Sequence, residues 1–104
     1  MTKVVVWLVD NKTKKIRISG HSGYADSGSD IVCSAISSSV MLAGSILEEV
    51  CPEHIINTDS EDAIIEIEIK KGNDLAYIVM KNLYLTLSEI SKQYPKNLSV
   101  RINK

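Results

Sequence analysis

The sequence has 104 residues, a length typical of one compact domain. Apolar residues make up 44% and charged residues 24%, which are ordinary globular values and exclude a chain that is disordered throughout. The formal net charge is −1, with 12 basic and 13 acidic side chains, so we expect no direct contact with nucleic acid. Lys14, Lys15 and Arg17 form the densest basic group, and a solvated turn explains them better than a phosphate-binding patch.

Targeting signals and cysteine spacing indicate the cellular compartment. The longest apolar run, Val4–Val9, is far short of the roughly 20 residues that span a bilayer. No secretory signal opens the chain, so we expect a cytoplasmic protein without a membrane partner. Cys33 and Cys51 fall at opposite ends of one predicted helix, about 27 Å apart. Because a disulfide needs Cα atoms within about 7 Å, we expect two free thiols.

Two strands are predicted before residue 20. The run Val4–Val9 is mostly β-branched, which predicts a strand that is buried on both faces or lies at a dimer seam. Asp10–Lys12 predicts a turn. Lys15–Ser19 then alternates in polarity, which predicts a second strand with Ile16 and Ile18 facing the core.

The segment Gly20–Asp30 differs from its flanks. It holds three glycines and three serines in eleven residues, a composition that cannot build core and favours a mobile backbone. Long loops in small domains are uncommon and usually functional. We therefore expect a functional loop here, and we expect Ser22–Ser29 to be mobile without substrate.

A helix is predicted over Ile31–Val50. Ser29 or Asp30 supplies the oxygen that caps its first turn, and Pro52 follows its end. Its apolar side chains recur on one helical face, as expected for a helix that packs on a sheet. They are Val32, Ile36, Val40, Ala43, Leu47 and Val50.

Two further strands are predicted after this helix. They cover Ile55–Ile56 and Ala63–Lys70, around a polar turn at 58–62. In the second of them Ile65, Ile67 and Ile69 face inward, while the residues between them face water.

A second helix and a last strand complete the chain. Asn73 or Asp74 caps the helix, which runs to about Tyr94 and is stopped by Pro95. The apolar stripe of the helix is Ala76, Met80, Leu83, Leu87, Ile90 and Tyr94, and Leu98, Val100 and Ile102 alternate in the last strand.

This order of elements predicts the fold class. The elements follow as ββαββαβ, and the connections between paired strands are short enough for hairpins. We therefore expect an α+β fold with one domain over residues 1–104, in which two long helices pack on a mostly antiparallel sheet.

The pair of His21 and Cys33 is the strongest candidate for chemistry. Cys33 falls in the first turn of the predicted helix, where the helix dipole and unpaired N–H groups favour thiolate over thiol. An imidazole beside it would complete a nucleophile and base for acyl transfer, and the same N–H groups could hold an oxyanion. Read without context, Cys33 could equally be a small buried side chain and His21 a surface residue.

No other constellation indicates a metal or a cofactor. His54 follows Cys51 by three positions, but two ligands do not make a zinc site. The acidic group Asp59, Glu61 and Asp62 lacks the glycine and spacing of a calcium loop and is most simply a solvated turn. We expect no metal and no cofactor.

Two motifs carry a resemblance to a known family. They are Gly20-His21-Ser22-Gly23-Tyr24-Ala25 and Asp30-Ile31-Val32-Cys33-Ser34-Ala35, the latter followed by Ser37. Together they resemble the ribosomal-processing cysteine protease family (Prp) of bacteria. The family usually has Ala where Ser22 and Ser34 stand, and both of these residues are small.

The resemblance implies roles for individual residues. It makes Cys33 the nucleophile and His21 the general base, with Gly20, Asp30 and Ser37 as supporting residues. Asp30 would either orient His21 or cap the helix, and Ser37 would lie one turn beyond Cys33 on the same face. The residues that the resemblance places in a substrate loop are Ser22, Gly23, Tyr24 and Gly28.

The resemblance also implies an activity and partners. Members are understood to remove the N-terminal extension of large-subunit ribosomal protein L-twenty-seven during ribosome assembly, and to be homodimers. We therefore expect a cytoplasmic cysteine endopeptidase whose substrate is a ribosomal protein. The alternative is a non-enzymatic, ribosome-associated binding module in which Cys33 is structural or senses redox conditions.

Overall fold

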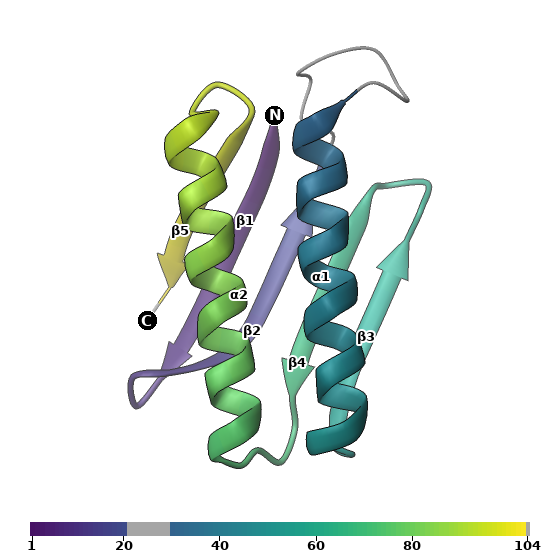
Figure 1. The fold of residues 1–104 in the computed structure, drawn as a ribbon, viewed down its shortest axis with the longest axis vertical. Helices are drawn as coiled ribbons and strands as arrows, with labels where there is room; N and C mark the ends of the chain where they lie inside the picture. Colours follow the sequence, from purple (N-terminus) through teal and green to yellow (C-terminus); the bar gives the residue numbers. More distant parts are fainter. Residues whose placement is uncertain (21–29, 104) are drawn as a thin grey trace.

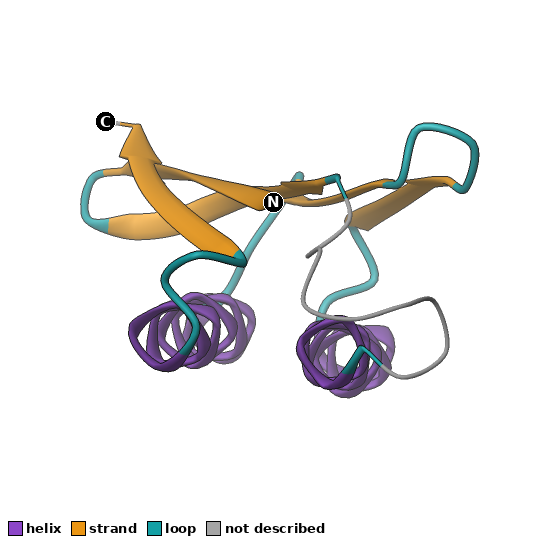
Figure 2. Cartoon of the chain, turned by 90° about the horizontal axis from the view of Figure 1, so that it is seen from above, coloured by secondary structure: helices purple, strands orange, loops and turns teal. Residues whose placement is uncertain are grey.

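The structure is a computed structural model that describes residues 1–20 and 30–103. In this part of the chain a five-stranded sheet is covered on one face by two helices that lie side by side (Figures 1 and 2). The predicted α+β class and the order ββαββαβ are confirmed. His21 and the predicted mobile loop Ser22–Ser29 lie outside the described residues.

The sheet is mixed, with one parallel pair. Its strands lie in the order β3-β4-β2-β1-β5, and only β1 and β5 pair in parallel among the described residues. This confirms the mostly antiparallel sheet. The elements are β1 (Thr2–Val9), β2 (Lys12–Ser19), α1 (Ile31–Val50), β3 (His54–Asp59), β4 (Ile64–Ile69), α2 (Asp74–Gln93) and β5 (Leu98–Asn103).

The two helices match the predicted boundaries because their ends are capped by side chains. Asp30 caps α1 and Asn73 caps α2, each by accepting backbone N–H bonds of the first turn. The apolar stripes of both helices pack on the sheet as predicted. The buried stripe residues are Val32, Ile36, Val40, Ala43 and Leu47 in α1, and Ala76, Met80, Leu83 and Leu87 in α2.

The first hairpin sets the register that places the C-terminal end of β2. Asp10 and Asn11 have φ values of 53° and 63°, which is the left-handed conformation of a primed turn that suits the twist of a hairpin. Val4 then pairs with Ile18 and Val6 with Ile16, so that four buried side chains share the helix-covered face. Continued to the strand ends, this register brings the start of β1 beside the end of β2.

Of the two predicted settings of the first strand, burial on both faces is wrong, and a place at a dimer seam stays a prediction. Val4 and Val6 are buried under the helices, whereas Val5 and Trp7 alternate with them, are half-buried, and face the side of the sheet opposite the helices (Figure 2). On that side Lys15 lies with its Nζ atom 5.0 Å from the centre of the Trp7 ring. A long amphipathic neighbour of this kind covers part of an aromatic side chain and explains why a β-branched run with one Trp can lie on an open face.

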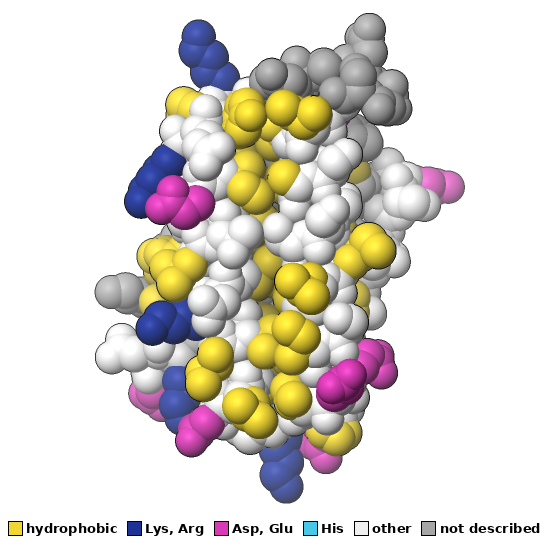
Figure 3. Space-filling model, in the orientation of Figure 1, with side chains coloured by type: hydrophobic (Ala, Val, Ile, Leu, Met, Phe, Trp, Pro, Cys, Tyr) yellow, Lys and Arg dark blue, Asp and Glu magenta, His cyan; other side chains and the backbone are white. Residues whose placement is uncertain are grey.

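Helix α1 is apolar on its outer side as well as on its inner side. By length and composition alone it could cross a membrane, but a core helix passes the same test, and a third of its most apolar window is buried here. Figure 3 shows apolar side chains along the outer faces of both helices, with a hollow between them. The more exposed ones are Ile31, Met41, Leu42 and Ile46 in α1, and Leu75, Ile78 and Leu85 in α2.

Candidate active site

Cys33 lies in the first turn of α1, directly above a side-chain cap. The Oδ1 atom of Asp30 accepts hydrogen bonds from the N–H groups of Val32 and Cys33, both at 3.0 Å. This is the usual N-cap geometry, and it fixes the backbone of Cys33 at the edge of the helix. The Cys33 side chain is half-buried and is a free thiol, as predicted for both cysteines.

The cap changes one expectation about the chemistry. The sequence suggests that unpaired first-turn N–H groups hold an oxyanion, but those of Val32 and Cys33 are engaged by Asp30, and that of Ser34 bonds the Asp30 carbonyl at 3.2 Å. The expectation is therefore wrong for these three donors.

We expect Asp30→Ala to lower the free energy of unfolding by about 1 kcal/mol, because two donors of the first turn lose their acceptor. Asp30→Asn should keep most of the stability, since an amide oxygen accepts the same bonds. Urea unfolding of both variants measures the difference. Equal loss in both variants would contradict a cap role, and a fall in turnover of the Asn variant at unchanged stability would assign the carboxylate to His21.

Cys33 opens onto a cleft of about 290 Å³ between α1 and the sheet. Gly20 and Ser37 line the same cleft, so the structure brings together three of the residues that the sequence singled out. The walls are largely apolar, with one polar rim. The remaining lining residues are Thr2, Ile18, Ile36, Thr58, Asp59, Ser60, Ala63, Ile64 and Ile65.

A second hollow of about 450 Å³ continues the cleft along α1, away from its N-terminal end. The two share Ser37, Thr58 and Ile65, and the second reaches as far as Glu48. It lies between α1 and two neighbouring strands, the edge strand β3 and β4. The cleft is therefore one end of an elongated groove, a shape that suits an extended chain better than a compact small molecule.

One wall of the cleft could not be predicted from the sequence, because its residues come from strands that are distant along the chain. Thr2 belongs to β1, and the rim residues Thr58–Ser60 belong to β3 and its turn. They reach the cleft because β2 pairs with β1 on one side and with β4 on the other. No local motif marks them, and only the register of the sheet could have found them.

Gly20 is required by the backbone at the mouth of the cleft. Its φ is +86°, and a Cβ atom there would lie 2.8 Å from the carbonyl oxygen of Met1. A side chain is therefore excluded both by conformation and by contact with backbone. The next residue in the chain, His21, lies outside the described residues, as do Ser22, Gly23, Tyr24 and Gly28 of the predicted substrate loop.

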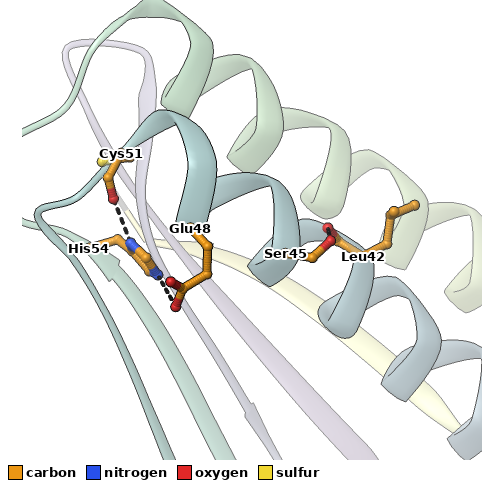
Figure 4. Close-up of polar contacts among 5 residues, drawn as sticks. All are labelled: Leu42, Ser45, Glu48, Cys51 and His54. Carbon is orange, nitrogen blue, oxygen red and sulfur yellow. Dashed lines mark hydrogen bonds and ion pairs between the residues drawn. The ribbon is translucent and has the colours of Figure 1, made fainter.

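Cys51 and His54 do not form a metal site. The Cys51 thiol is fully buried and donates to the Lys71 carbonyl at 3.5 Å. His54 places Nδ1 on the Cys51 carbonyl and Nε2 at 3.8 Å from Glu48 Oε1 (Figure 4). These contacts tie the end of α1 to the start of β3. Within residues 1–20 and 30–103 no group of three or more His, Cys, Asp or Glu side chains could hold a metal ion.

We expect Cys51→Ser to leave peptide cleavage within about twofold of the parent, because the residue caps the far end of α1 from Cys33. A serine hydroxyl can donate to the Lys71 carbonyl in place of the thiol, so the stability cost should stay near 1 kcal/mol. Turnover and thermal unfolding of the purified variant measure both effects. Lost activity at normal stability would contradict the placement of the two cysteines.

Comparisons with solved structures show which fold the chain shares. Two structures of the S. aureus ribosomal processing protease Prp match it with TM-scores of 0.91 and 0.84, at 23% and 22% identity. Each match covers 99% of this chain and 100% of the other. The first is a complex with a covalently linked product peptide, and the second is a complex with a substrate peptide.

A third structure, SMU.848 from Streptococcus mutans, has a TM-score of 0.85 at 18% identity, and the match covers 98% of this chain and 93% of that one. No curated protein matches the sequence. The family description "Cysteine protease Prp" matches residues 1–99, nearly the whole chain. Together with the cysteine at the cleft, this match decides between the two classes weighed from sequence: the chain belongs to the Prp family and is a cysteine protease.

Proposed function

We propose that this protease removes the N-terminal extension of ribosomal protein L-twenty-seven during ribosome assembly, through an acyl-enzyme at Cys33 with His21 as general base. The observation that carries the proposal is the position of Cys33, half-buried in the first turn of α1 and on the wall of the cleft. Gly20, which precedes His21 in the chain, lies on the same cleft. The family membership supports the class of reaction, and the two motifs support the assignment of the residues.

The proposed mechanism has two steps. His21 takes the thiol proton as the Cys33 sulfur attacks the scissile carbonyl carbon, which forms a carbon–sulfur bond. The carbon–nitrogen bond then breaks, and the imidazolium gives its proton to the leaving amine. In the second step His21 takes a proton from water, the hydroxide attacks the thioester carbon, and the sulfur leaves to recover its proton.

The form of the groove supports an extended peptide as substrate. Beside Cys33 the cleft is lined by four isoleucines, which favour an apolar side chain next to the scissile bond. The groove continues along α1, so several further residues of a peptide can lie against it. An N-terminal extension is an unfolded segment of this kind, whereas a folded domain would not enter the groove.

The test uses the ribosomal protein of the same organism, produced with its N-terminal extension. Incubation with the purified protease should release the extension as one peptide, detected by the change in intact mass. The matched control is the Cys33→Ala variant, which should release nothing. A ribosomal protein that stays intact with the parent enzyme would overturn the proposed substrate.

Alkylation of the thiols tests the mechanism without a substrate. Iodoacetamide should modify Cys33 at pH 7, where an ordinary thiol is mostly protonated. Cys51 is fully buried in the same molecule and serves as the internal control, resolved by peptide mapping. Equal, slow modification of both cysteines would contradict a catalytic thiolate.

The same resemblance supports two further parts of the proposal, a homodimer and a cytoplasmic location. Sedimentation equilibrium at micromolar protein concentration should give twice the chain mass of 11.5 kDa. Fractionation of cells that express the protein from its own promoter should place it with the soluble ribosomal material. A monomer at all concentrations, or recovery in the membrane fraction, would contradict these parts.

A further inference from the structure

Gly20 lies where the ends of three strands meet, and it is held from both sides. Its N–H donates to the carbonyl of Ala63, just before β4, at 3.0 Å. Its carbonyl accepts from the hydroxyl of Thr2, at the start of β1, at 3.1 Å. Both polar groups of this glycine are therefore fixed by neighbouring strands, beyond the last residue of β2.

The Thr2 hydroxyl is built into the structure. Thr2 is 2% exposed, and its N–H donates to the Asn97 carbonyl at 2.9 Å, which fixes the residue between β2 and β5. A buried hydroxyl loses its water partners and needs an acceptor, which Gly20 supplies. A Cβ atom on Gly20 would lie 2.8 Å from the carbonyl oxygen of Met1. Only a glycine therefore fits beside the backbone at the start of the chain.

The hydrogen bond from Thr2 constrains the backbone that joins Gly20 to the next residue. The Gly20 carbonyl belongs to the peptide group that joins residues 20 and 21, and a peptide group is planar. A hydrogen bond to that carbonyl therefore sets the plane in which the chain leaves the sheet. Thr2, Gly20 and Cys33 all line one cleft, so this exit lies at the proposed site of reaction.

We propose that Thr2 is a positioning residue: its hydrogen bond to the Gly20 carbonyl fixes the peptide group that leads to His21, and through it the placement of the general base. This inference rests on the proposed roles of His21 and Cys33. Thr2 lines the cleft, but it is only 2% exposed and its hydroxyl is engaged by Gly20, so we expect its effect in the chemical step more than in substrate affinity.

Thr2→Val is the decisive variant, because it removes the hydroxyl and keeps the branched shape. We expect kcat to fall about tenfold, since a small misplacement of a catalytic group costs about that much or more. KM should change little, the variant should stay folded at the assay temperature, and Thr2→Ser should restore most of kcat. Thr13→Val is the matched control, because Thr13 is also buried, at 3% exposure, but at the opposite end of β2.

A double-mutant cycle on the alkylation rate of Cys33 tests the route of the effect, and it needs no turnover. If Thr2 acts through His21, Thr2→Val slows alkylation in the parent but adds nothing in His21→Ala. Equal slowing in both backgrounds, or an unchanged kcat in Thr2→Val, would overturn the inference. An unchanged rate in His21→Ala itself would instead overturn the proposed function, so the two failures are distinguishable.

Discussion

Replacement of Cys33 by alanine should abolish peptide cleavage and leave the fold intact. The thiol is the nucleophile of the proposed mechanism, and the acyl-enzyme forms on its sulfur. Alanine has the highest helix propensity, and the N–H of residue 33 would still bond Asp30, so α1 should keep its first turn. Intact-mass detection of the released peptide and thermal unfolding measure the two parts of this prediction.

Cys51→Ser provides the control for this result, because it also removes one of the two cysteines. It should cleave normally, which would show that loss of activity follows from the position of the thiol and not from the loss of a thiol in general. Cleavage by Cys33→Ala, at any rate above the uncatalysed reaction, would end the nucleophile assignment. Unfolding of Cys33→Ala would be inconsistent with the half-buried position of the side chain at a helix edge.

The parts of the fold that the sequence predicted well are those fixed by local signals. Helix α1 begins and ends where predicted because Asp30 caps it and its apolar residues recur on one face. Strand β3 was predicted only over Ile55–Ile56, whereas it covers His54–Asp59. Its last residues are polar and exposed at the edge of the sheet, so no apolar alternation marks them.

The residues of the site also fall into two groups, those marked by local sequence signals and those placed by contacts between distant segments. Gly20, Cys33 and Ser37 were recognisable because they belong to two short motifs, and the structure places all three on one cleft. Thr2 is 18 positions from Gly20, and its contact depends on the pairing of β1 with β2. The cap at Asp30 could be predicted from the sequence, but which use of the Cys33 N–H prevails could not, because an N-cap and an oxyanion donor use the same group.

Replacement of His21 by alanine should lower turnover by about 10²–10⁴-fold, the usual contribution of a general base. The fold should survive, because His21 comes after Ser19, the last residue of β2, and belongs to no apolar stripe of the sequence. The rate of the parent should fall as the pH is lowered, since protonation of the coupled thiol and imidazole removes the reactive form. In the variant this acid limb should change its position, because the imidazole no longer contributes to it.

Two measurements decide this prediction, the pH profile of turnover and thermal unfolding of His21→Ala. Unchanged turnover would exclude His21 as the base. A loss of turnover that accompanies unfolding would instead assign the histidine a structural role. The variant Thr2→Val distinguishes the placement of the imidazole from its presence. It should lower kcat but keep the acid limb of the parent, since the imidazole is still present and only its placement has changed.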